Sequence, residues 1–227
     1  KEKIRLNLEY QKRSGDMVVE AVGISKGFGD LVLFSDVSLN IRWGERVAVI
    51  GANGSGKTTL IRILLGLEPP SRGYVNLGEG LIISYFDQEQ RGLDSNNTIY
   101  DELGESTSLT KNEAMYLLAK LLFRGDRAFK KIEQLSGGEK NRVILSKLVY
   151  TRANFLVLDE PTNHLDIPSI EVLEEALSAF QGTVILVSHD RRLLSKVANR
   201  VIELDNGKVR FYPGGYEDYL VMAQAGG

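Results

Sequence analysis

Apolar and polar positions alternate in short runs along the first part of the chain, which predicts β-strands rather than helices. Residues 4–10 alternate Ile, Leu, Leu and Tyr with polar residues, the period-2 pattern of a half-buried strand. The same reasoning predicts further strands at residues 17–24, 31–34, 37–41, 74–77 and 81–86. Gly and Pro residues interrupt these runs, as turns between strands require.

From about residue 98 to residue 150 the pattern becomes helical. Thr110 and Glu113 have the spacing of a capping box ahead of a run rich in Leu. Ser136 begins a second helix, whose apolar face carries Val143, Ile144, Leu148 and Val149. This block is predicted to be a helical lobe inserted between strands.

Short apolar strands alternate with helices before and after this lobe. Residues 46–50 predict a strand and residues 58–67 a helix. The later segments predict strands at 155–158 and 183–187, helices at 168–180 and 191–198, and a hairpin at 201–204 and 208–212. This alternation predicts an α/β fold with a largely parallel sheet that helices cover on both faces.

Composition narrows the class of protein further. The 227 residues fit one large domain or two small lobes, and a hydrophobic fraction of 43% is sufficient for a core. A net charge of −2 does not indicate a positively charged surface over the whole domain, as binding to nucleic acid or an anionic membrane would favour. The chain has no cysteine, no signal-peptide pattern and no apolar run near the roughly 18 residues of a membrane helix. It does not start with Met, so we expect a piece of a longer protein.

A glycine-rich loop with the sequence GANGSGKT, Gly51 to Thr58, matches the phosphate-loop pattern in full. It follows a predicted strand and precedes a predicted helix, the context that separates a phosphate loop from an incidental Gly-rich turn. We expect Lys57 to reach the β- and γ-phosphates and the Thr58 hydroxyl to ligate Mg²⁺. The predicted nucleotide-binding residues are Gly51, Asn53, Gly54, Ser55, Gly56, Lys57, Thr58 and Thr59.

Two acidic residues, Asp159 and Glu160, follow the apolar strand 155–158. Ligands bind at the carboxyl ends of strands in open α/β sheets, although acids at a strand end can equally be solvated. The complete phosphate loop in the same chain favours the catalytic role. Asp159 is predicted to hold Mg²⁺, directly or through water. Glu160 is predicted to orient and polarise a water that attacks the γ-phosphate.

Three further residues are candidates with ordinary structural alternatives. His189 follows the strand 183–187 and could donate a hydrogen bond to the γ-phosphate, although a lone His is more often structural. Gln88 follows another predicted strand and could contact Mg²⁺ or the attacking water, or be a polar loop residue. Phe28 lies in the predicted turn 27–30 and could stack on a base, or be a core residue.

The sequence LSGGEK at residues 135–140 predicts a second anion site. Ser136 and Glu139 have capping-box spacing, and Gly137 and Gly138 leave backbone N–H groups bare in the first turn. The phosphate loop already serves the chain's own nucleotide. The local pattern alone therefore does not say whose phosphate this helix would bind.

These motifs, in this order, resemble the nucleotide-binding domain of ATP-binding cassette (ABC) proteins over about residues 16–220. "GANGSGKTT" is similar to the Walker A loop, "LSGGE" to the signature sequence and "FLVLDE" to Walker B with its catalytic Glu160. "HLD", which ends at Asp166, is similar to the D-loop, and "SHD" to the switch histidine. Gln88 falls at the Q-loop position, and Phe28 at that of the adenine-stacking aromatic, where Tyr is common.

The resemblance implies a P-loop NTPase fold of the ABC type, with an antiparallel β subdomain, a mostly parallel core sheet and a helical lobe at about residues 98–150. It implies a linker end or edge strand at 1–15, the nucleotide-binding domain at 16–220 and a tail at 221–227. The cofactors it implies are ATP and Mg²⁺. The implied site consists of catalytic Glu160, His189 and Gln88 and metal-binding Thr58, Gln88 and Asp159.

ABC cassettes pair head to tail with ATP between them, so the resemblance also implies a second cassette as a partner. Leu135, Ser136, Gly137, Gly138 and Glu139 would then cap the partner's ATP. "LSGGEKNRV", "LDEPTNHLDI", "GTVILVSHDRRLL" and "PGGYEDYL" narrow the resemblance to the second cassette of ABC-F proteins. Members of that subfamily are cytoplasmic, have two cassettes and no membrane domain, and many act on ribosomes in translation or antibiotic resistance.

Two other functions remain open at this stage. The same type of ATPase domain drives ABC membrane transporters, so the chain could be the ATPase subunit of such a transporter. It could also be a regulatory nucleotide-binding module without hydrolysis, although Glu160 would then have no use.

Overall fold

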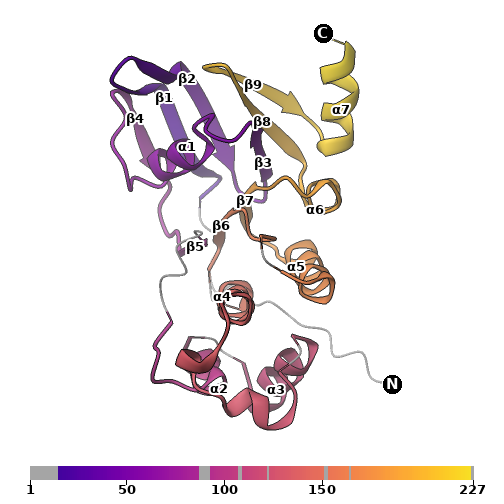
Figure 1. Ribbon diagram of the computed structural model, residues 1–227. Coiled ribbons are helices and arrows are strands. Elements are labelled where there is room, and N and C mark those ends of the chain that lie inside the picture. The colour runs from indigo at the N-terminus through magenta and orange to yellow at the C-terminus, as the bar shows by residue number, and fades with distance from the viewer. Residues whose placement is uncertain are drawn as a thin grey trace.

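The computed structural model describes residues 15–86, 93–106, 109–121, 123–150, 153–163 and 165–225. The first strands form an antiparallel sheet in the order β2-β1-β4 (Figure 1). β1 (Met17–Phe28) and β2 (Leu31–Arg42) form a long hairpin, and β4 (Arg72–Leu77) pairs with the other edge of β1. The antiparallel subdomain that the resemblance implied is therefore present.

A second, six-stranded sheet has the order β5-β6-β7-β3-β8-β9. Neighbouring strands from β5 to β8 are parallel, and β9 alone pairs antiparallel, with β8. The prediction of a largely parallel sheet is confirmed. The bounds of its strands are β3 (Arg46–Gly51), β5 (Ile83–Phe86), β6 (Phe155–Asp159), β7 (Thr183–Val187), β8 (Arg200–Asp205) and β9 (Lys208–Pro213).

Alternate residues of the central strands enter two separate hydrophobic clusters. In β6, Phe155 and Val157 join the cluster that includes the antiparallel sheet and α1, while Leu156 and Leu158 join the cluster that includes the helical lobe. β6 and β7 are buried at every position. A strand covered on both faces has no solvent side, which explains the continuous apolar runs at residues 155–158 of β6 and 184–187 of β7.

Helices surround the core sheet and form the lobe at the lower end of Figure 1. α1 (Lys57–Leu64) follows the phosphate loop. The lobe contains α2 (Ile99–Ser106), α3 (Lys111–Lys120), short 3-10 helices at Gly125–Phe129 and Ile132–Gln134, and the start of α4 (Gly137–Tyr150). The remaining helices are α5 (Ile167–Ala179), α6 (Arg191–Val197) and α7 (Tyr216–Ala225).

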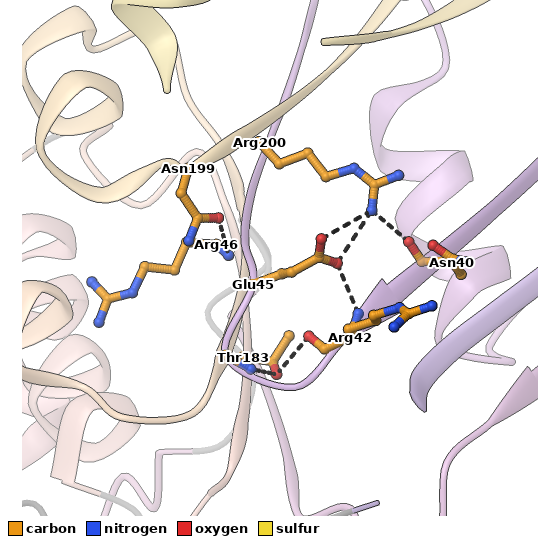
Figure 2. Close-up of polar contacts among 8 residues, drawn as sticks. Asn40, Arg42, Glu45, Arg46, Thr183, Asn199 and Arg200 are labelled. Carbon is orange, nitrogen blue, oxygen red and sulfur yellow. Dashed lines mark hydrogen bonds and ion pairs between the residues drawn. The ribbon is translucent and has the colours of Figure 1, made fainter. Parts of the chain in front are cut away.

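A polar seam joins the two sheets at the amino end of β3, as Figure 2 shows. Arg200 Nη1 donates to the Asn40 carbonyl oxygen at 2.6 Å and lies 3.2 Å from Glu45 Oε2. The same Glu45 atom accepts from the Arg42 N–H at 2.8 Å. These contacts link β2 to β8. They lie at the end of β3 remote from the phosphate loop, so they stabilise the subdomain arrangement without entering the site.

Several predicted boundaries differ from the structure. The segments 31–34 and 37–41 form one strand, β2, in which Asp36 takes a positive φ of 52°. Phe28 is the last residue of β1 rather than a turn residue, because the turn itself is Gly29-Asp30. The helix predicted at 58–67 ends at Leu64, before Gly66 at φ 71°. The pattern did not predict α7, and the strand predicted at 4–10 lies outside the described residues.

Candidate nucleotide-binding and catalytic site

The phosphate loop connects β3 to α1, and its backbone requires glycine at both ends. A Cβ on Gly51 would lie 2.4 Å from the Leu204 carbonyl oxygen of neighbouring β8. Gly56, the N-cap of α1, has φ 98°, a conformation that side chains disfavour. The loop can therefore wrap closely around a ligand at the positive end of the α1 dipole.

Lys57 is largely buried and folds back over this loop. Its Nζ donates to the carbonyl oxygens of Gly51 and Ala52, both at 2.9 Å. Burial lowers the pKa of Lys57, whereas the negative charges of Glu160 and Asp159 raise it. Among the residues the structure describes, the buried Ser55 Oγ has no hydrogen-bond partner in the protein. An orphaned hydroxyl beside a glycine-rich loop fits an oxygen-rich ligand such as a phosphate.

Thr58 and Asp159 come together at the first turn of α1. The Thr58 hydroxyl donates to Asp159 Oδ2 at 2.6 Å, and Asp159 is 5% exposed at the end of β6. A hydroxyl and a carboxylate oxygen are the hard donors that Mg²⁺ prefers. The residues present therefore fit the Mg²⁺ that the phosphate-loop pattern implies. Gln88, the other predicted metal contact, lies outside the described residues.

Glu160 and His189 face each other at the carboxyl ends of β6 and β7. His189 Nε2 lies 3.1 Å from Glu160 Oε1 and 3.2 Å from Asn53 Oδ1. Glu160 has a positive φ of 51°, and its N–H donates to the Val187 carbonyl oxygen at 2.9 Å. A non-glycine residue at positive φ is uncommon, and such backbone strain gathers at functional sites. The sheet order β6-β7-β3 brings Glu160, His189 and the phosphate loop to one edge.

The signature residues lie apart from this edge. α4 is separated from α1 in Figure 1. Leu135 is buried and anchors the segment, whereas Ser136 and Gly137 are exposed. The predicted capping box is confirmed, since the Ser136 N–H donates to Glu139 Oε2 at 2.9 Å and the Glu139 N–H to Ser136 Oγ at 3.3 Å. The backbone hydrogen bond from Ser136 lowers the pKa of Glu139.

Asp166 connects the D-loop to the signature helix within the chain. Its Oδ1 accepts from the Ser169 N–H at 3.1 Å and so caps α5, while its Oδ2 lies 3.3 Å from Arg142 Nη1 of α4. Burial raises the pKa of Asp166, but hydrogen bonds from Ser169 and the charge of Arg142 outweigh that effect and lower it. The sequence analysis missed Arg142, because an arginine on a helix gives no local signal of a distant partner.

Phe28 is accessible at the tip of the β1–β2 hairpin. It is 55% exposed, which excludes the alternative of a core residue. Lys26 Nζ lies 5.1 Å from the centre of its ring. The described residues leave this ring free of the core, in a position where a flat base could stack.

Comparisons with known proteins also point to an ATP-binding cassette. The family model described as ABC transporter matches residues 34–163. The chain is 42% identical over 223 residues to "ABC transporter F family member 5" of Arabidopsis thaliana, covering 97% of this chain and 32% of that protein. It is 36% identical to "Energy-dependent translational throttle protein EttA" of Escherichia coli (strain K12), covering 93% of this chain and 41% of that protein. The chain thus spans less than half of either relative.

A solved structure shares this fold over nearly its full length. It is titled "Structure of ATP binding subunit of ABC transporter", is 25% identical and superposes with a TM-score of 0.71, covering 92% of this chain and 93% of that one. No helix within the described residues has the length and apolar character needed to cross a membrane. Since the matching family model covers more than half of the chain, this protein belongs to the ABC transporter family and is an ABC-type ATPase domain.

Proposed function

We propose that this cassette binds Mg²⁺-ATP at the edge formed by β3, β6 and β7 and hydrolyses it as one of a head-to-tail pair. One observation carries the proposal: the Glu160–His189–Asn53 contact lies at the same sheet edge as the buried Lys57 and the Thr58–Asp159 pair. Charge neutralisation, metal binding and proton acceptance are therefore available together, which phosphoryl transfer requires.

The phosphates are proposed to bind in the loop from Gly51 to Thr58. Backbone N–H groups and the α1 dipole attract the negative charge, and Lys57 exchanges its carbonyl partners for phosphate oxygens. Ser55 Oγ gains an acceptor in the same step. Phe28 supports the adenine ring by stacking.

Thr58 and Asp159 are the residues that would hold Mg²⁺, together with Gln88. The metal supplies charge neutralisation for the phosphate oxygens. Its two described ligands are already in contact, at 2.6 Å, so binding needs little rearrangement of the protein.

Glu160 is proposed to orient the attacking water and to accept its proton. The Glu160 side chain is 11% exposed, so few other waters compete for it. His189 is proposed to hold the carboxylate in place, since its Nε2 lies 3.1 Å from Glu160 Oε1 and 3.2 Å from Asn53 Oδ1. His189 is half exposed and is therefore also open to a γ-phosphate.

The signature residues Leu135 to Glu139 are proposed to act on the partner's nucleotide. The exposure of Ser136 and Gly137 and the separation of α4 from α1 in Figure 1 support action in trans. Closure around ATP followed by opening after hydrolysis would then be the working cycle, because loss of the γ-phosphate removes the bridge.

The protein that carries this cassette is proposed to act on the ribosome in the cytoplasm, in translation or antibiotic resistance. The relatives named for translational throttling and for the F family support this choice. A transporter ATPase subunit is the second candidate, which the likeness to the solved ATP-binding subunit favours.

The test uses the full-length protein and its Glu160→Gln variant. We expect steady-state ATP hydrolysis at this site to fall by about 10²–10⁴-fold, the typical contribution of a general base. ATP binding should persist, so the variant should co-sediment with ribosomes when ATP is present and not when ADP is present. Undiminished hydrolysis would overturn the catalytic assignment. Co-purification with a membrane protein instead of ribosomes would favour the transporter.

A further inference from the structure

Glu174 is a fully buried carboxylate that the proposed mechanism does not use. It lies on α5 with 0% of its surface exposed. Both of its oxygens face α6: Lys196 Nζ donates to Oε2 at 2.5 Å, and Arg192 Nε lies 3.1 Å from Oε1. The Arg192 contact is ionic without hydrogen-bond geometry, so Lys196 provides the directed bond.

The two helices that Glu174 joins both begin at residues of the proposed site. α5 starts immediately after its N-cap Asp166, the D-loop residue. α6 starts after Asp190, whose Oδ1 caps it at 3.1 Å from the Leu193 N–H, and His189 directly precedes that cap. A shift or rotation of α6 would therefore move His189 relative to Glu160.

Apolar packing alone does not determine the rotation of α6. Leu193, Leu194 and Val197 of α6 are buried in the same cluster as Leu173 and Leu177 of α5. Such packing is largely non-directional, and volume-preserving apolar exchanges are well tolerated. A directed charge contact fixes one register, as buried polar groups do in several proteins.

A contribution to stability explains the burial of Glu174 less well than a role in orienting α6 does. Desolvation of a buried ion pair often cancels its Coulombic gain, and an apolar pair of similar size is frequently as stable. Arg192 and Lys196 are about half exposed and could remain hydrated without Glu174. Glu174 therefore contributes more to the orientation of α6 on α5 than to the free energy of folding.

We propose that Glu174 is a positioning residue for ATP hydrolysis: through Lys196 and Arg192 it holds α6 in register with α5, so that His189 stays within reach of Glu160. The inference rests on the proposed catalytic roles of His189 and Glu160. It assigns no contact between Glu174 and the nucleotide.

The experiment compares kcat, the KM for ATP and the melting temperature in the full-length protein. The Glu160→Gln rate is subtracted as the contribution of any partner site. In Glu174→Gln we expect kcat to fall about tenfold or more, because a displacement of about 1 Å costs up to 100-fold. The KM for ATP should change less than about twofold, since Lys57 and its loop belong to other elements. The ring-proton signals of His189, one of two histidines in these 227 residues and assigned from the spectrum of a His189→Gln variant, should shift in NMR spectra.

Three further variants separate positioning from folding. Glu174→Met with Lys196→Met keeps an apolar contact and the fold, and we expect the same loss of kcat with a melting temperature near that of the parent. Lys196→Arg retains the charge and should retain kcat. Glu171→Gln is the matched control, because Glu171 lies on the same helix, exposed and 3.9 Å from Arg192, and should leave kcat unchanged.

The outcome that would overturn the inference is a folded double-Met variant with parental kcat and unchanged His189 signals. A fall in kcat that only matches the loss of folded protein would also overturn it. If Glu160→Gln hydrolyses ATP normally, the proposed function itself fails. If Glu160→Gln is inactive while Glu174→Gln is fully active, only the positioning role fails.

Discussion

At the scale of single residues, Lys57 illustrates how the loop keeps a cation available for phosphate. Its Nζ is held by two neutral carbonyl oxygens, those of Gly51 and Ala52. The pKa of Lys57 is lowered by burial, and the negative charges of Glu160 and Asp159 offset only part of that shift. A phosphate offers a charged acceptor in place of the neutral ones, and charge-assisted hydrogen bonds are the stronger kind.

Lys57→Ala should therefore weaken ATP binding. A hydrogen bond to a charged group contributes about 1.5–3 kcal/mol, which corresponds to a roughly 10- to 150-fold rise in Kd. Titration of the purified protein with a fluorescent ATP analogue measures this Kd. Lys208→Ala, an exposed residue of β9, is the control and should leave Kd unchanged. An affinity within about twofold of the parent for Lys57→Ala would contradict the assignment.

At the scale of elements, the capping box of α4 uses a charge that depends on pH. The pKa of Glu139 is lowered in the folded protein, mainly by the hydrogen bond from the Ser136 N–H, and Arg142 and Arg127 act in the same direction. A carboxylate with a depressed pKa contributes stability above its unfolded value of about 4.5. That contribution is lost as the pH falls through the lower folded value.

Glu139→Gln keeps a capping side chain but removes this charge. We expect a loss of about 0.3–1 kcal/mol at neutral pH, from the helix dipole, which lowers the melting temperature by about 1–4 °C. The difference from the parent should shrink as the pH falls below about 4. Calorimetry from pH 3 to about pH 8 tests this. Glu133→Gln, exposed and 3.8 Å from Lys131, is the control. A difference that grows on acidification would contradict the linkage.

At the scale of the whole molecule, the two helix starts that are proposed to bind phosphate lie apart. The start of α1 belongs to the chain's own phosphate loop, whereas the exposed start of α4 lies in the helical lobe (Figure 1). A single nucleotide cannot occupy both ends of this fold. We propose that the chain instead carries half of a composite site, which a second cassette facing it would complete.

Ser136→Ala should accordingly impair ATP-dependent closure of the pair while monomer ATP affinity stays within about twofold. Closure can be followed by small-angle scattering in the Glu160→Gln background. The substitution also removes an N-cap, which costs about 0.5–2 kcal/mol. Thr110→Ala is the matched control, because it removes the same kind of capping box from α3. If Thr110→Ala impaired closure equally, the effect would be one of stability. A fall in monomer affinity would mean that α4 serves its own nucleotide.

Local patterns predicted most of the fold because each rests on short-range physics. All-apolar runs identified β6 and β7, which are buried on both faces. Capping boxes located the starts of α3 and α4. The pattern failed at Phe28, which glycines on either side made resemble a turn residue, and at α7, where only Tyr216 is buried and Val221, Met222 and Ala225 are exposed.

Residue order along the chain therefore sufficed for the phosphate loop, the two acids at the carboxyl end of β6 and the helical lobe, because strand, turn and cap chemistry act over a few residues. The contacts between distant segments required the folded chain. Glu160 meets His189 and Asn53, Asp166 meets Arg142, and Glu174 meets Lys196 only after β3, β6 and β7 align and the helices pack. A side chain's partners across such separations depend on strand order and helix rotation, which no local pattern encodes.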